Sequence, residues 1–199
     1  MSTTHDQVRA ANLRTVTALA LLFLVPLIAA FWLYYGAGWR PAGHINHGEL
    51  IQPVIQLPDV RLPMAMEGTP VTNVFAHHWT IVYIGDGRCA EACHRALYVM
   101  RQARFALNND MARVQRVFLV TGDCCDRAFL LREHPGLIVL DASTSGGTKL
   151  LAQFPPTDLA HTLFLVDPLG NLMMRYDSRQ DLRGLLEDLK RLLQLSHIG

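Results

Sequence analysis

Apolar runs alternate along this chain with segments whose apolar residues recur every three or four positions. The short apolar runs are bounded by turn residues and predict strands at residues 79–84, 115–121, 137–140 and 162–167. The periodic segments predict helices at residues 92–108 and 179–195, with shorter helices expected at 126–134 and 148–154. Strand and helix therefore alternate, as they do in α/β domains.

Weaker signals complete the expected set of strands. A loose apolar and polar alternation with prolines at residues 52–61 fits an edge strand. The turn residues Pro168–Asn171 join the strand at 162–167 to a hairpin partner at 172–176. Parallel strands come first in this order and an antiparallel pair comes last. We therefore expect an α/β, thioredoxin-like domain with a central mixed sheet flanked by helices.

The first apolar segment, residues 16–35, has the length of a membrane anchor. Its twenty residues carry no charge, and a helix of that length crosses a hydrocarbon core about 30 Å thick. Its aromatic end, Phe31–Tyr35, is typical of a membrane interface and unlike the small-residue cleavage site of a signal peptide. Arg9 and Arg14 precede the segment, which favours an N-terminus inside the cell and a C-terminus outside.

These signals divide the chain into four parts. We expect a cytoplasmic N-terminus at residues 1–15, a single transmembrane anchor at 16–35, a stalk at 36–52 and the thioredoxin-like domain at 53–199. In a bacterium the anchor would lie in the inner (cytoplasmic) membrane, and the domain would face the periplasm.

Composition and charge limit the classes of function. Half of the residues are hydrophobic, which is enough for one good core in a chain of 199 residues. The formal net charge is +1 and no run of Lys or Arg occurs, so we exclude nucleic acid as a partner. The four cysteines all follow the anchor, on the side where disulfides persist. They are too few for a disulfide-stapled fold, so redox-active thiols or metal ligands fit better.

Cys89 and Cys93 carry the clearest chemical signal. They follow the strand at 79–84 and the breaker residues Gly85–Gly87, at the start of the helix at 92–108. We expect exposed thiols there, with the thiolate favoured by the helix N-terminus. Thiols at this spacing lie one helical turn apart, close enough to share one soft metal ion or to form a disulfide. These residues alone do not distinguish a copper carrier from a thiol reductase.

The second cysteine pair, Cys124 and Cys125, follows the strand at 115–121. The carboxyl ends of neighbouring strands are where sites gather in α/β folds, so a second redox role is one reading of this pair. Two small residues at the end of a strand are the other reading, and both stay open.

Two further alternatives concern the whole protein. Cys89, Cys93 and His94 resemble the C-x-x-C-H motif of covalent c-type haem attachment, with a spacer one residue too long. A non-catalytic membrane assembly factor that keeps the fold and binds a partner is the other alternative. It would show neither copper binding nor disulfide exchange.

Three features of the chain form one pattern. They are the segment Ile84–Cys93 with its C-x-x-x-C spacing, the segment His161–Gly170 with its Asp-Pro-x-Gly turn, and the N-terminal anchor with its short stalk. Together they resemble the SCO family of membrane-anchored, thioredoxin-fold, copper-binding proteins that assist cytochrome c oxidase assembly. His94 stands where the family usually has proline, and Glu91 stands where it has aspartate.

The SCO resemblance implies a function and a set of ligands. It implies copper, Cu(I) or Cu(II), held by Cys89, Cys93 and His161, in a metallochaperone that also has the thiols of an oxidoreductase. The implied partner is a cytochrome c oxidase subunit or another copper or redox assembly factor. Without the resemblance, a lone histidine before a strand is more often an ordinary polar residue.

Overall fold

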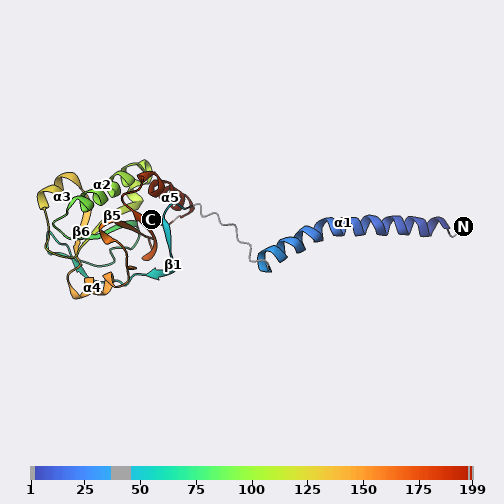
Figure 1. The fold of residues 1–199 in the computed structure, drawn as a ribbon, viewed down its shortest axis with the longest axis horizontal. Helices are drawn as coiled ribbons and strands as arrows, with labels where there is room; N and C mark the ends of the chain where they lie inside the picture. Colours follow the sequence, from blue (N-terminus) through green and yellow to red (C-terminus); the bar gives the residue numbers. More distant parts are fainter. Residues whose placement is uncertain (1–2, 37–45, 197, 199) are drawn as a thin grey trace. The chain divides into compact units, whose positions relative to one another are not determined.

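The computed structural model describes residues 3–36, 46–196 and 198. The chain divides into two units, Met1–His44 and Ile45–Gly199. The described part of the first unit is helix α1 (Thr3–Tyr35) and the turn that ends it (Figure 1). The segment Asn12–Tyr35 of this helix is long and apolar enough to cross a membrane, at about 1.5 Å per residue. It contains the whole segment predicted as an anchor.

The second unit is built on a mixed six-stranded sheet. Its strands in chain order are β1 (Glu49–Gln56), β4 (Trp79–Gly85), β5 (Val114–Val120), β6 (Leu137–Asp141), β7 (Thr162–Val166) and β8 (Asn171–Asp177). They lie in the order β1-β8-β7-β4-β5-β6. Strands β4, β5 and β6 are parallel, whereas β7, β8 and β1 add antiparallel pairs. The predicted thioredoxin-like mixed sheet is confirmed.

The start of the sheet lies earlier in the chain than the sequence pattern indicated. Strand β1 begins at Glu49, inside the segment 36–52 expected to be a stalk. Most of the remaining stalk, residues 37–45, lies outside the described residues. A small second sheet pairs β2 (Leu62–Pro63) with β3 (Pro70–Val71).

Helices cover both faces of the sheet. They are α2 (Glu91–Phe105), α3 (Arg127–Glu133), α4 (Ser145–Leu151) and α5 (Leu182–Leu195), with 3₁₀ turns η1 (Asn108–Arg113) and η2 (Leu159–His161). Helices α2, α3 and α5 lie on one side of the sheet and α4 lies on the other (Figure 1). All four coincide with predicted helices, although their ends differ by several residues.

Strand β4 is the centre of the core. Six of its seven residues are buried, because one face packs against α2 and α5 while the other packs toward α4. Trp79, Ile81 and Tyr83 belong to the first cluster, and Val82 and Ile84 belong to the second. The chain therefore leaves the middle of a rigid sheet at Gly85, immediately before the cysteine segment.

Candidate functional site

A tight turn connects β4 to the first cysteine. The backbone N–H of Cys89 donates to the carbonyl of Asp86 at 3.1 Å, and the Asp86 side chain accepts from the backbone N–H of Arg88 at 2.8 Å. Cys89 itself has a positive φ of 46°, and α2 begins two residues later. The turn therefore places Cys89 and Cys93 across the N-terminal end of α2.

The two cysteines form a disulfide and are buried. Their Cα atoms are 4.9 Å apart, and Cys89 and Cys93 are only 5% and 4% exposed. The expectation of exposed thiols was wrong. Cys93 lies on the same face of α2 as Ala96, Leu97 and Met100, so both sulfurs pack into the core cluster between α2 and the sheet.

His161 lies at the same end of the sheet as the cysteine segment. Strand β7 runs antiparallel to β4 with Leu163 opposite Tyr83. Extending this register by two residues places His161, just before β7, opposite Gly85 at the end of β4. The chain turns toward Cys89 from Gly85. The backbone N–H of Ser178 donates to the His161 carbonyl at 2.7 Å and fixes this position.

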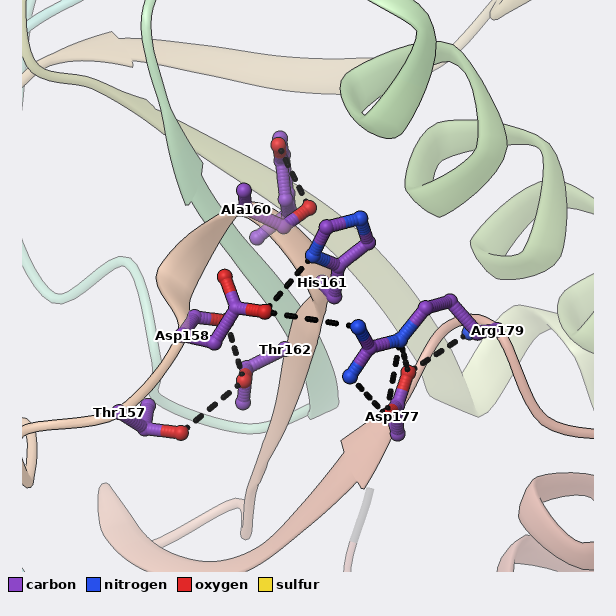
Figure 2. Close-up of polar contacts among 8 residues, drawn as sticks. Thr157, Asp158, Ala160, His161, Thr162, Asp177 and Arg179 are labelled. Carbon is purple, nitrogen blue, oxygen red and sulfur yellow. Dashed lines mark hydrogen bonds and ion pairs between the residues drawn. The ribbon is translucent and has the colours of Figure 1, made fainter.

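The imidazole of His161 is oriented by a carboxylate. Its Nδ1 lies 2.8 Å from Asp158 Oδ2, which leaves Nε2 as the nitrogen for a ligand. Figure 2 shows the Nε2 edge of the ring turned away from Asp158, Thr162 and Arg179. The side chain of His161 is partly exposed. Asp158 was not among the site residues expected from the sequence, although it lies only three residues before His161.

Charged and polar groups surround this histidine. Arg179 contacts Asp158 at 3.7 Å and Asp177 at 2.6 Å, and its hydrogen bond holds the pKa of Asp177 below its ordinary value (Figure 2). The hydroxyl of Tyr83 donates to the carbonyl of Ala160 at 3.3 Å. Burial raises the pKa of Tyr83 to about 12, and the nearby charge of Asp158 adds to the shift. Tyr83 therefore stays a neutral hydroxyl at neutral pH.

The residues present suit a soft metal only after the disulfide is reduced. Among residues 3–36, 46–196 and 198, no group of three or more His, Cys, Asp or Glu side chains is arranged to hold a metal ion. With their sulfurs joined, Cys89 and Cys93 offer no thiolate. Reduction would supply two soft sulfur donors from residues whose Cα atoms lie 4.9 Å apart, and His161 would supply an imidazole nitrogen at the same sheet end.

The second cysteine pair, Cys124 and Cys125, lies beside the loop that carries Gly87 and Cys89. Cys124 is exposed and Cys125 is partly buried, and the two are joined as a vicinal disulfide across a cis peptide. His94, next to Cys93, stacks on the ring of Phe129 with 4.2 Å between the ring centroids. His94 thus has a packing role between α2 and α3.

The strand order, the sheet with helices on both faces and the cysteine pair after the first parallel strand define a thioredoxin-like domain. Residues 79–196 match the family model described as "Transmembrane-like, thioredoxin-like, C-terminal domain", and the chain belongs to this family. A search of curated proteins found no match.

Solved structures with this fold include several Sco proteins. The apo Sco1 protein from Thermus thermophilus is 17% identical, with 76% of this chain and 99% of that chain covered and a TM-score of 0.59. Copper-bound yeast Sco1 is 16% identical, with 70% and 92% covered and a TM-score of 0.60. Copper-bound ScoI from Arabidopsis thaliana is 19% identical, with 70% and 99% covered and a TM-score of 0.58. The resemblance to SCO proteins is confirmed for the fold.

Proposed function

We propose that this protein is a membrane-anchored copper-binding protein that acts in assembly of the copper centre of cytochrome c oxidase. Cys89, Cys93 and His161 would hold the copper ion. The observation that carries the proposal is the Asp158–His161 pair at the sheet end from which the cysteine segment leaves. The yeast and Arabidopsis Sco proteins of the same fold, both solved with copper bound, support it.

The chemistry follows from the two states of the cysteine pair. Two electrons and two protons convert the disulfide into two thiols, whose thiolates suit Cu(I). Loss of the same two electrons restores the disulfide and removes both sulfur ligands. The redox state of Cys89 and Cys93 would therefore decide whether copper is bound or released.

Thiol–disulfide exchange is the second candidate function. It is favoured by the disulfide between Cys89 and Cys93 at the N-terminal end of α2. A reductase without copper would use the same two cysteines and would not need His161.

The location and partner belong to the same proposal. Helix α1 would cross the inner membrane with its N-terminus in the cytoplasm, and the thioredoxin-like domain would face the periplasm. The partner would be a cytochrome c oxidase subunit or another copper or redox assembly factor.

Equilibrium titration with Cu(I) against a strong chelator tests the copper site. The reduced full chain in detergent should bind one Cu(I). Replacing either sulfur by Cys89→Ser or Cys93→Ser should weaken binding by at least about 100-fold, because one of two soft donors is lost.

The double variant Cys124→Ser/Cys125→Ser is the matched control, since it removes two thiols outside the proposed site. Equal affinity in Cys89→Ser, Cys93→Ser and the native chain would remove the copper assignment and leave thiol–disulfide exchange as the function.

A further inference from the structure

We propose that Cys124 and Cys125 form an entry pair, which passes reducing equivalents from an external dithiol protein to the buried Cys89–Cys93 disulfide. This inference rests on the proposed function for the role of Cys89 and Cys93, because a copper site there requires reduced sulfurs. It assigns a role to the one cysteine pair that the copper site does not use.

The two pairs differ in their accessibility. Thiol–disulfide exchange requires a thiolate to reach a sulfur of the disulfide. Cys89 and Cys93 are only 5% and 4% exposed, so the thiol of a folded partner protein has poor access to this pair. Cys124 is exposed and Cys125 is partly buried. The second pair therefore extends from solvent toward the core, whereas the first lies inside it.

The two pairs also lie at the same edge of the sheet. Strands β4 and β5 are parallel neighbours with Gly85 opposite Val120, so both cysteine segments leave the sheet at its carboxyl edge. A Cβ atom added to Gly87 would lie 2.8 Å from the Cα of Cys124, which means that the two loops touch through their backbones. Cys89 follows Gly87 by only two residues.

A second contact joins the two segments just after their cysteines in sequence. The ring of His94, one residue after Cys93, stacks on Phe129 in the first turn of α3, four residues after Cys125. Cys125 also packs against the core cluster that contains Cys89 and Cys93. The Gly87–Cys124 and His94–Phe129 contacts thus hold the two cysteine segments against each other.

The relay balances in electrons and protons. A thioredoxin-like dithiol first reduces Cys124–Cys125 and is itself oxidised to a disulfide. The thiolate of Cys125 then attacks the Cys89–Cys93 disulfide, forms a mixed disulfide and displaces one sulfur of that pair as a thiolate. Cys124 resolves the mixed disulfide, so Cys124–Cys125 is oxidised again while Cys89 and Cys93 take up the two protons as thiols.

Reduction kinetics in the full chain test the relay. The oxidised native chain and Cys124→Ser/Cys125→Ser are mixed in detergent with catalytic thioredoxin, thioredoxin reductase and NADPH. Acid quenching, alkylation and peptide mass mapping then follow the thiols of Cys89 and Cys93. We expect their appearance to be at least about tenfold slower in the double variant, because thioredoxin must then reach the buried pair directly.

A small phosphine reductant provides the comparison within the same variants. It should reduce Cys89–Cys93 at equal rates in both proteins, because it needs no protein docking. Equal rates with thioredoxin would overturn the relay. If the phosphine rates differ, the variant Cys124→Ala decides, because Cys125 should then be trapped in a mixed disulfide with Cys89 or Cys93. Absence of that species would also overturn the relay.

Copper binding separates this inference from the proposed function. Both proteins, after chemical reduction, are titrated with Cu(I). Equal binding together with equal thioredoxin rates would reject the relay alone. Slower thioredoxin reduction in the double variant without copper binding in either protein would keep the relay and reject the copper site.

Discussion

Asp158 is the residue that gives His161 a defined ligand nitrogen. A carboxylate bound to Nδ1 fixes the tautomer and orientation of a histidine and leaves Nε2 for the ligand. We expect Asp158→Asn to weaken Cu(I) binding by about 10- to 100-fold without changing disulfide reduction by the phosphine. Chelator competition measures the affinity.

The control for Asp158 is Asp177→Asn, since Asp177 pairs with Arg179 in the same polar group. Its effect on Cu(I) affinity should be much smaller. An affinity unchanged in Asp158→Asn would mean that Asp158 does not position a copper ligand.

Gly87 is the residue at which the two cysteine loops meet. A side chain there would collide with the backbone of Asp123 and Cys124, which cannot shift as a flexible side chain can. We expect Gly87→Ala to lower the free energy of unfolding by about 1–3 kcal/mol, measured by urea denaturation. Gly122→Ala is the matched control, because its Cβ would meet nothing closer than 3.4 Å. Equal stability in the two variants would contradict the close approach.

At the residue scale, sequence motifs located the cysteines and His161 but not their surroundings. The burial of Cys93 was readable from its spacing to Ala96, Leu97 and Met100 on one helical face. The contact of Gly87 with Cys124 was not readable, because it depends on how two loops pack. The motifs identify the reactive side chains, whereas tertiary packing determines which other molecules can reach them.

At the scale of elements, the end of α3 makes the fold sensitive to acid. His134, which caps this helix, is 4% exposed. Burial lowers the pKa of His134 to about 4, and the charges of Arg101 and Arg116 add to the shift. The imidazole is therefore neutral in the folded protein at pH values where it is already charged in the unfolded chain.

This difference sets the direction of the pH dependence. Between the unfolded pKa of about 6.5 and the folded value of about 4, the unfolded chain binds the extra proton. Stability from His134 is therefore complete above pH 6.5 and is lost as the pH falls toward 4, by at most about 3 kcal/mol. Urea denaturation at pH 7 and pH 5 should show a smaller loss in His134→Leu than in the native chain. Equal losses would contradict this assignment.

Periodicity predicted the elements, but local capping decided where they begin. Helix α4 begins at Ser145, because the Thr144 side chain accepts from the backbone of Gly147. The predicted start of α5 at 179 was early for the same reason, since Asp181 caps a helix that begins at Leu182. Strand β1 was partly missed because only Ile51 among its residues is buried, which leaves little alternation to read.

At the scale of the whole molecule, the second unit should fold in water, whereas the apolar helix of the first unit should require detergent. Both core clusters are formed by residues between 51 and 193, so the second unit has its own core. We expect residues 46–199 alone to fold and remain in solution without detergent, with a cooperative urea transition followed by circular dichroism. The full chain should need detergent because the apolar segment Asn12–Tyr35 is exposed. A non-cooperative transition in the shorter chain would contradict an independent core.

The strand order could be predicted only as a class. Alternating strands and helices indicated parallel pairing for β4, β5 and β6, as found. The pairing of β7 with β4 joins residues about eighty positions apart, and no local pattern specifies it. That pairing alone brings His161 level with the cysteine loop, so the site could be inferred only through the resemblance to SCO proteins.

The place of Trp79 has an optical consequence. Three tryptophans occur in the chain, and Trp79 is the one that lies in the second unit. It is 4% exposed at the first position of β4, within the cluster that contains both buried cysteines. The fluorescence of residues 46–199 therefore comes from a single indole in the core, and a red shift of its emission would report unfolding without any added label.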